Sequence, residues 1–279
     1  MIVDFHAHIF PESICAEREA CCRLEPEFEL LYGAPGTRMI GAADLVAAMD
    51  ADGVDRAVVF GFPWRSPELF RRHNDFVIEA VRAYPERLTG FGCFDPQSPG
   101  AVDEAERCLD RGLAGIGELA FYRSGIDDAA LDALDPVMAV CRSRHKPVLL
   151  HTNEPVGHAY PGKSPNTLAQ IYRLVERFRD NTLILAHWGG GLFFYHLLKK
   201  EVKERLRNVY FDTAASPFLY DPSVYAVAGQ VIGFDRILFG SDYPLLPPRR
   251  YFNEMESAGL DREARRQICG ENARRLLGL

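Results

Sequence analysis

The sequence predicts an α/β protein, a distorted (β/α)8 TIM barrel formed by one domain that covers residues 1–279. Eight short apolar runs alternate with longer amphipathic segments along the whole chain. Several runs are almost continuously apolar, as expected for parallel strands that are covered on both faces. Strand–helix units of about 30 residues each fill a chain of this length, which favours a barrel over an open sheet.

The expected strands and helices follow one another in strict alternation. The strands are expected at 2–8, 55–62, 88–94, 114–120, 147–152, 183–188, 209–214 and 236–243. Helical patterns occupy 42–53, 66–85, 100–112, 128–145, 164–180, 190–206, 221–232 and 262–279. The helix at 66–85 has the clearest boundaries, since Ser66 and Pro67 form a start signal and Pro85 ends it.

Two connections exceed ordinary loop length. We expect a long loop at 9–40, after the first strand, and a second one at 152–165. Both follow the carboxyl end of a strand, which is the side on which barrel enzymes carry their active sites. Loops of this length are often lids or binding loops.

Composition and charge exclude several classes of partner. The formal net charge is −7 and no block of like charges is present, which argues against nucleic acid or an anionic membrane surface. We expect a cytoplasmic protein, because no signal peptide or membrane span is visible. The seven cysteines are odd in number and form no C-x-x-C pair, so we interpret them as reduced thiols. The expected partner is a small-molecule substrate, and a homo-oligomer is only a general expectation.

His6 and His8 stand two residues apart near the carboxyl end of the first expected strand. Because side chains alternate along a strand, both imidazoles point to one face and form a candidate pair of metal ligands. Such a pair also arises by chance, so its meaning depends on which other residues reach the same place.

Four further residues that can bind metal stand at the ends of other expected strands: Glu118, His151, His187 and Asp242. In a barrel these ends converge on one mouth. Taken singly, each histidine is better explained as a satisfied core or loop residue. The set of six favours a metal centre.

The segments DFHAH, LLHT, LAHWGG, LFGSDYP and ENARRLLGL resemble the amidohydrolase superfamily, particularly its amidohydrolase-2 branch. The resemblance covers the whole chain, in order and in spacing. It implies that His6, His8, His151 and Asp242 hold a divalent ion and that His187 is an unligated catalytic histidine. The branch contains hydrolases and also decarboxylases that resemble aminocarboxymuconate-semialdehyde decarboxylase.

Three imidazoles and one carboxylate suit Zn2+, with Mn2+ as the second candidate, and we expect one ion rather than two. A divalent ion lowers the pKa of bound water from about 15.7 toward about 7. Asp242 would accept a proton from that water, and His187 would orient the water or polarise a substrate carbonyl. The main hypothesis is therefore a metal-dependent hydrolase that acts on a small amide, lactone or ester.

Glu118 has two interpretations. In binuclear relatives that resemble the TatD nucleases, a glutamate on the fourth strand binds metal, and His187 would then become a ligand of a second ion. Alternatively, Glu118 orients a histidine ligand without touching metal. The LAHWGG and LFGSDYP segments favour a single ion.

Candidate substrate contacts rest on weaker patterns. His158, Tyr160 and Lys163 lie in the second long loop, and Lys163 is a candidate partner for a substrate carboxylate. A solvated surface loop explains these three residues equally well. Trp64 and Trp188 follow expected strand ends, and we place both at the mouth. The glycines at 189–191 either bind an anion through free N–H groups or permit close backbone approach.

Three other functions remain as alternatives. A non-oxidative decarboxylase for a small carboxylic acid would use the same residues, with protonation of a ring or enol carbon driving the loss of CO2. A binuclear TatD-like phosphodiesterase is a lesser alternative. A non-catalytic barrel with a structural metal is disfavoured, because structural zinc sites are closed by four protein ligands.

Overall fold

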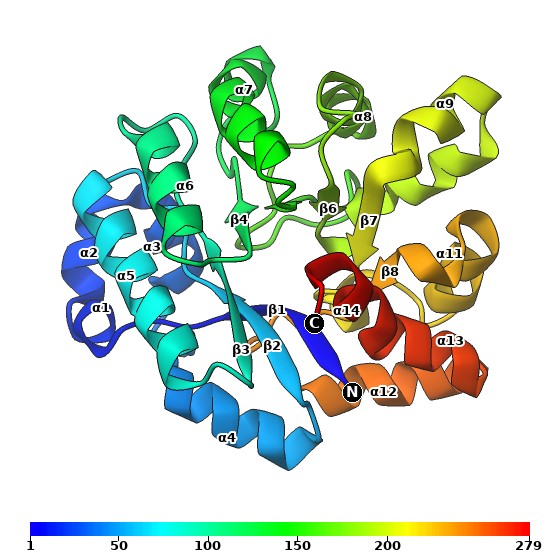
Figure 1. The fold of residues 1–279 in the computed structure, drawn as a ribbon, viewed down its shortest axis with the longest axis horizontal. Coiled ribbons are helices and arrows are strands. Elements are labelled where there is room, and N and C mark those ends of the chain that lie inside the picture. The colour runs from blue at the N-terminus through cyan, green and yellow to red at the C-terminus, as the bar shows by residue number, and fades with distance from the viewer.

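The computed structural model describes residues 1–279, and its strands form one parallel barrel surrounded by helices (Figure 1). Each strand pairs with the next one along the chain, in the order β1 to β8. The bounds are β1 Val3–His8, β2 Arg56–Phe60, β3 Leu88–Gly92, β4 Gly115–Leu119, β5 Val148–Leu150, β6 Leu183–Leu185, β7 Val209–Asp212 and β8 Ile237–Leu238. The predicted (β/α)8 barrel is thereby confirmed.

The barrel is closed by backbone hydrogen bonds between β1 and the chain that follows β8. Phe5 N donates to Phe239 O at 2.7 Å, and His8 N donates to Tyr243 O at 2.8 Å. Between these two hydrogen bonds, the backbone N–H of Asp242 donates to His6 O at 2.9 Å. The short strand β8 therefore continues as a bonded extension, which fixes Asp242 against β1.

Inward-facing side chains fill the barrel toward the end where the strands begin. They form a separate cluster that includes Val3, Phe5, Phe91 and Leu149, and the rings of Phe5 and Phe91 meet edge to face at 5.8 Å. Ala273 of the C-terminal helix belongs to the same cluster, so this helix plugs the end of the barrel where the strands begin. The polar side chains lie at the opposite end, where the strands finish.

The main outer helices agree with the expected segments. They are α4 Ala42–Asp52, α5 Pro67–Ala83, α6 Ala101–Asp110, α7 Asp128–Ser143, α8 Leu168–Arg177 and α11 Val224–Ile232. Side-chain caps fix three of their starts, because Ser66, Asp127 and Thr167 each accept a backbone N–H of the first turn. No helix combines the length and the apolar character that a membrane span requires.

The segment 9–40 is helical, where a loop was expected. It contains α1 Glu12–Ala16, α2 Arg18–Leu24 and α3 Pro26–Tyr32. These helices are too short to show a hydrophobic period, and tertiary packing holds them. Phe28 packs on the ring of Trp64 at 4.4 Å. The carboxylate of Glu25 accepts the Ser66 N–H at 2.8 Å and so ties the segment to the start of α5.

The helices of the structure differ from the expected helices in three further respects. The expected helix at 190–206 is a series of tight turns, His187–Leu197, followed by α9 Lys200–Arg205, because left-handed residues at its start prevent an α-helix. The expected helix at 262–279 is divided into α13 Arg262–Arg266 and α14 Asn272–Leu277 by a π-helical turn, where Ile268 O accepts from Phe239 N instead. Two helices were not expected, α10 Ser216–Leu219 and α12 Pro248–Ser257.

Gly190 should be intolerant of any side chain. Its φ is +62°, and an added Cβ would lie 2.2 Å from the carbonyl oxygen of Asn153. We expect Gly190→Ala to lower the free energy of unfolding by more than about 3 kcal/mol. Gly53 is the control, since its φ is +72° with no atom within 4 Å, and Gly53→Ala should cost about 1 kcal/mol. Denaturant titration of both variants measures the difference, and equal losses would contradict the close approach.

Candidate functional site

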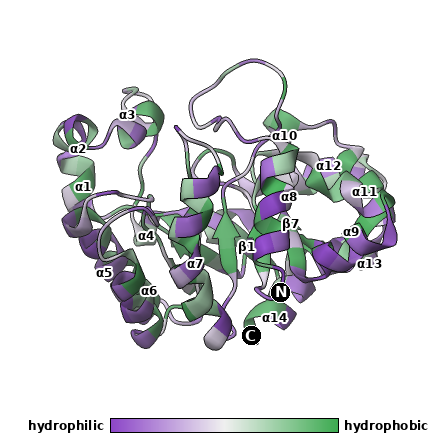
Figure 2. Ribbon diagram, turned by 90° about the horizontal axis from the view of Figure 1, so that it is seen from above, coloured by the Kyte–Doolittle hydropathy of each residue, from purple (hydrophilic) through white to green (hydrophobic).

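The polar cluster lies at the end of the barrel where the strands finish. Figure 2 shows α3 and α10 at the end of the molecule opposite the two termini. Residues of both helices line a cavity of about 980 Å3, together with the loop after β5 and the chain after β8. His8, Glu118, His151, His187 and Asp242 form part of its wall. The structure therefore brings together the strand-end residues selected from the sequence.

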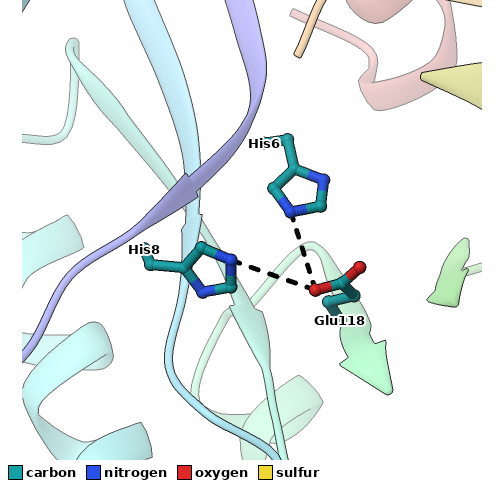
Figure 3. Close-up of side chains that lie close together, drawn as sticks. All are labelled: His6, His8 and Glu118. Atoms are coloured by element: carbon teal, nitrogen blue, oxygen red, sulfur yellow. Dashed lines mark ion pairs between the residues drawn. The ribbon is translucent and has the colours of Figure 1, made fainter. Parts of the chain in front are cut away.

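His6 and His8 point toward the same carboxylate oxygen, as Figure 3 shows. Their Nε2 atoms lie 3.6 and 3.9 Å from Glu118 Oε2. The pairing of β1 with β2 shifts register between Asp4 and Ala7, next to His6. On the far side of each ring, Nδ1 is held by an acceptor: Asp212 Oδ2 at 2.8 Å for His6, and Gly61 O at 3.2 Å for His8.

The other two histidines are held in the same manner. His151 Nε2 donates to Gly162 O at 2.9 Å, so its Nδ1 faces Glu118 Oε1 at 3.0 Å. His187 Nδ1 donates to Ala214 O at 2.9 Å, so its Nε2 faces the same oxygen at 3.6 Å. Each of the four imidazoles therefore has one nitrogen fixed from behind and the other directed at the cluster. Such outer contacts orient histidine ligands in metal sites.

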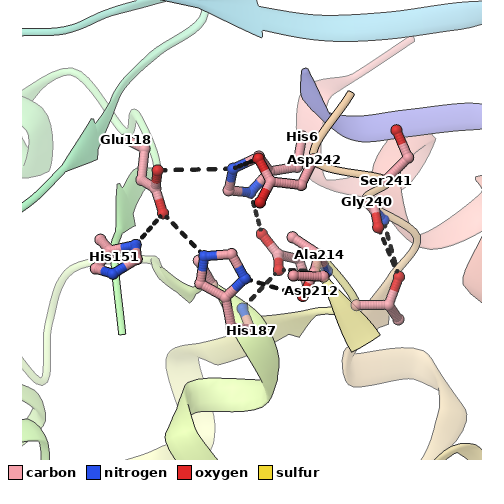
Figure 4. A network of polar contacts seen from close by, with 12 residues as sticks. His6, Glu118, His151, His187, Asp212, Ala214, Gly240, Ser241 and Asp242 are labelled. Atoms are coloured by element: carbon pink, nitrogen blue, oxygen red, sulfur yellow. Dashed lines mark hydrogen bonds and ion pairs between the residues drawn. The ribbon is translucent and has the colours of Figure 1, made fainter. Parts of the chain in front are cut away.

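Asp212 joins three parts of this arrangement (Figure 4). One carboxylate oxygen accepts from His6 Nδ1, and the other accepts the backbone N–H groups of His187 at 2.9 Å and Ala214 at 3.0 Å. Asp212 has no solvent exposure. Asp212 was not expected from the sequence, although it ends β7 just as the other site residues end their strands.

Asp242 is placed by a strained turn at the end of the β8 extension. Its φ is +59°, and His187 has a φ of +55°. Left-handed backbone is uncommon for residues other than glycine and concentrates at functional sites. Asp4 supports the turn, because its carboxylate accepts the backbone N–H groups of Ser241 at 2.9 Å and His6 at 3.1 Å. Asp242 Oδ1 then lies 3.3 Å from His8 Nε2 and 3.6 Å from His6 Nε2.

Opposite charges dominate the titration of the cluster. Burial opposes ionisation, yet the contacts with His8, His6 and His187 lower the pKa of Asp242 to about 2. Burial lowers the pKa of His187, but the carboxylates of Glu118 and Asp242 outweigh it and raise that pKa to about 9. Glu118 likewise has a pKa well below its ordinary value, since the neighbouring histidines offset its burial. The cluster is thus a set of mutually stabilised charges.

The residues fit a divalent metal ion. His6 Nε2 is completely buried and has no hydrogen-bond partner, although it faces two carboxylates. Three overlapping groups of side chains have ligand atoms within 4.8 Å of one another: His6, His8 and Glu118; His6, His187 and Asp242; and Glu118, His151 and His187. Imidazole and carboxylate together suit Zn2+ or Mn2+. An unpaired buried nitrogen is costly unless it binds something, and a cation would meet that requirement.

Polar groups on the cavity wall offer contacts for a bound molecule. Tyr32 and Tyr122 line the cavity, and burial together with the nearby charge of Glu118 raises the pKa of both phenols, which keeps them protonated. Arg38 is the one arginine or lysine in the lining. Its guanidinium lies over the Tyr243 ring at 5.5 Å and donates to the Tyr243 hydroxyl at 3.3 Å. The sequence analysis selected none of these residues.

Trp64 and Trp188 do not line the cavity, contrary to expectation. Both are fully buried and absent from its wall. The Trp64 indole donates to His73 Nδ1 at 2.9 Å, and the Trp188 indole donates to Ser216 Oγ at 2.9 Å. Each N–H is satisfied within the protein, so these rings pack between barrel and helices instead of meeting substrate.

The loop after β5 contributes two of its three expected residues. His158 and Tyr160 line the cavity, whereas Lys163 does not. Lys163 Nζ donates to Glu154 Oε1 at 2.8 Å, and Tyr160 donates to the other oxygen of Glu154 at 2.8 Å. Lys163 is therefore already paired and closes its own loop, which removes it as the partner of a substrate carboxylate.

The glycines at 189 and 190 serve close backbone approach. All three glycines at 189–191 have positive φ, and a Cβ on Gly190 would overlap the Asn153 carbonyl. A Cβ on Gly189 would lie 2.7 Å from the Phe211 ring, whereas a Cβ on Gly191 would meet no atom closer than 3.9 Å. Of the two interpretations of these glycines, the geometry supports packing of the turn after β6 against its neighbours.

Comparison with known proteins identifies the family and several relatives. The amidohydrolase family profile (Amidohydro_2) matches residues 3–279. Gamma-resorcylate decarboxylase of Polaromonas sp. is 24% identical in an alignment of 256 positions that covers 77% of this chain and 78% of that protein. The crystal structure of 5-carboxyvanillate decarboxylase from Sphingomonas paucimobilis is 19% identical with a TM-score of 0.77, covering 100% of this chain and 99% of that one.

A third relative was crystallised with manganese. The 5-carboxyvanillate decarboxylase of Novosphingobium aromaticivorans, complexed with manganese and 4-hydroxy-3-methoxy-5-nitrobenzoic acid, is 18% identical with a TM-score of 0.77 and covers 100% of this chain and 96% of that one. The metal of that relative is manganese, so the preference for Zn2+ expected from the sequence is not specifically supported.

The relatives also correct the main functional hypothesis. They are decarboxylases, so the expectation of a hydrolase is wrong, and the decarboxylase alternative agrees better with the known proteins. The metal-site geometry does not separate these two reactions, which explains the error. The family profile spans almost the whole chain, and the four strand-end histidines and Asp242 come together at one mouth: this protein is a member of the amidohydrolase family.

Proposed function

We propose that this protein is a metal-dependent decarboxylase that removes CO2 from a hydroxylated aromatic acid without oxidation. The observation that carries the proposal is the convergence of four oriented imidazole nitrogens on two carboxylates inside a large cavity. The functions of the relatives favour decarboxylation among the reactions that such a site can support.

One divalent ion would be held by His6, His8, His151 and Asp242. Mn2+ is the first ion to test because it is present in a relative, with Zn2+ as the second. When bound, the ion would act as a Lewis acid toward a substrate carboxylate or phenol oxygen. His151 would bind the ion through Nδ1, since its Nε2 is held by Gly162 O. Glu118 Oε1 lies 3.0 Å from that Nδ1 and is the second carboxylate that faces the ion, while His187 would remain free for the proton transfer.

The cavity wall would position the acid. Arg38 would bind an anionic oxygen of the substrate, as the one arginine or lysine of the lining. The protonated hydroxyls of Tyr32 and Tyr122 would donate to ring oxygens. The aromatic faces of these residues match a flat ring. Substrate oxygens and ring faces thus have separate partners in the protein.

The reaction requires one proton at the ring carbon that carries the carboxylate. The proton adds to that carbon, the bond to the carboxylate carbon breaks, and its electron pair restores the aromatic ring as CO2 leaves. Two groups of the cavity can hold the proton, Asp242 Oδ and His187 Nε2. On His187 the other nitrogen is occupied by Ala214 O, so Nε2 is the atom available to the substrate.

Release of CO2 tests the proposal directly. Purified protein loaded with Mn2+ should convert gamma-resorcylate, 5-carboxyvanillate or a related hydroxybenzoic acid to the phenol with loss of one CO2, and chelation should abolish the reaction. Lactone and amide panels measured in parallel should stay unchanged. Hydrolysis of the panel without any loss of CO2 would contradict the proposal.

His187→Asn and Asp242→Asn should separate proton transfer from metal binding. His187→Asn should keep metal content near wild type while kcat falls about 100-fold or more. Asp242→Asn should lose metal as well as activity, because it removes a carboxylate ligand. Metal content per chain and the rate of CO2 release are the two readouts. Loss of metal in His187→Asn would make His187 a ligand and favour a second ion.

Asp212→Asn should weaken metal binding although Asp212 would not touch the ion. The amide loses the charge that holds His6 Nδ1–H, so the ring is no longer fixed with Nε2 toward the cluster. We expect a 10- to 100-fold increase in the Kd for Mn2+, measured by titration of metal-free protein. Asp235→Asn, at an exposed aspartate away from the site, is the matched control. An unchanged Kd would show that His6 needs no such support.

A further inference from the structure

We propose that the substrate carries an apolar extension, an alkyl or aryl group on the side of the ring away from the carboxylate. The extension would lie against the apolar rim, by which we mean Leu30, Val156, Phe218 and Leu245. This inference rests on the proposed decarboxylase function and adds the class of acid that the site selects.

The apolar rim consists of large side chains that face water. Their exposed fractions are 46% for Leu30, 71% for Val156, 58% for Phe218 and 55% for Leu245. They come from four separate segments, namely α3, the loop after β5, α10 and the chain after β8. All four also line the cavity. Exposed apolar side chains that gather around one opening indicate a binding surface.

The cavity wall also carries apolar side chains that are less exposed than those of the rim. Leu31 and Leu219 are partly buried and line the cavity below it, and Tyr32 and Tyr122 follow at greater depth. Leu31 approaches the loop after β5 closely, since an added Cβ on Gly162 would lie 3.9 Å from it. The apolar surface is therefore the wall of a passage. A second protein placed on the rim would cover the opening through which Glu118 and Asp242 reach solvent.

The cavity is also larger than a single ring would fill. Its volume of about 980 Å3 lies at the upper end of the range of about 300–1,000 Å3 that holds drug-sized ligands. A benzoic acid with two hydroxyl groups is smaller than such ligands. Held with its carboxylate at the metal cluster, it would leave the rim exposed to water.

The charges of the lining favour an apolar group over a polar one at this place. Arg38 is the one arginine or lysine of the lining, and the proposed function already uses it for an anionic oxygen. The charge of Glu154 is balanced by Lys163, and its other carboxylate oxygen accepts from the Tyr160 hydroxyl. The rim residues themselves offer only hydrocarbon, so the group that they would bind is apolar.

A chain-length series tests the inference. Mn2+-loaded protein is assayed with 2,6-dihydroxybenzoic acids that carry hydrogen, methyl, propyl or pentyl at carbon 4. We expect kcat/KM to rise about two- to fourfold for each methylene that the rim covers. The matching products, resorcinols substituted at carbon 5, are titrated by calorimetry and should show the same gain in affinity. This second readout does not depend on turnover.

Substitutions in the apolar rim test whether it causes the gain in kcat/KM and in affinity with chain length. Phe218→Ser and Leu245→Ser should reduce the gain per methylene in both readouts. Leu197→Ser is the matched control, because Leu197 is 66% exposed but does not line the cavity, and it should leave the gain unchanged. Sedimentation of all three variants reports whether the rim instead joins two copies of the chain.

The outcomes separate this inference from the proposed function. Decarboxylation of the unsubstituted acid with no dependence on chain length overturns the extension and leaves the function intact. Affinity for the resorcinols that rises with chain length, without any loss of CO2, supports the apolar subsite and overturns the decarboxylase. A smaller particle in Phe218→Ser or Leu245→Ser, with the gain per methylene as in wild type, makes the rim a subunit contact and overturns the inference.

Discussion

The carboxylate of Asp212 lies completely buried beneath the site and accepts three N–H groups from three parts of the barrel. One comes from the His6 ring on β1, and two come from the turns after β6 and β7. A buried carboxylate needs such partners, since an unpaired charge in the interior is strongly unfavourable. The positions of His6 and His187 follow from this requirement, and the direction of the His6 ring decides where its free nitrogen points. The geometry of the cluster therefore depends on a residue that faces away from the cavity.

The strands alone would leave this cluster open to water. The cavity exists because two long connections rise above the barrel, the helical segment α1–α3 and the loop after β5. The first is held by aromatic packing and by the contact of Glu25 with the start of α5. The second is held by Glu154, which binds Lys163 and Tyr160 at once. The catalytic residues thus belong to the regular frame, whereas the surfaces that would recognise a substrate belong to these connections.

This division explains what could be predicted from the sequence. The strands and the strand-end residues His6, His8, Glu118, His151, His187 and Asp242 could be predicted, because period and position fix them in a barrel. Asp212 carried the same signal and was overlooked. Helix α12 buries Tyr251 and Met255 four residues apart, but its prolines and charges hide the pattern.

The remaining features depend on tertiary contacts. Arg38 lies in a segment without any period, and nothing local shows that it reaches the cavity. Trp64 and Lys163 were misplaced because their partners, His73 and Glu154, are chosen by folding and not by sequence spacing. The reaction could not be predicted from the ligand residues, because hydrolysis and decarboxylation use the same ligand set.

The hydrogen bond from His151 to the carbonyl of Gly162 has a consequence for the history of such proteins. Specificity in barrels usually changes through the exchange of loops on an unchanged frame. Here a backbone atom of the loop after β5 also aims a histidine of the metal cluster. If this loop changed to accept a new acid, the carbonyl of Gly162 would have to stay in place. Otherwise His151 would lose its orientation toward the metal cluster. New substrates are therefore more accessible through changes at α3 and α10, where no such bond to the cluster exists, than through this loop.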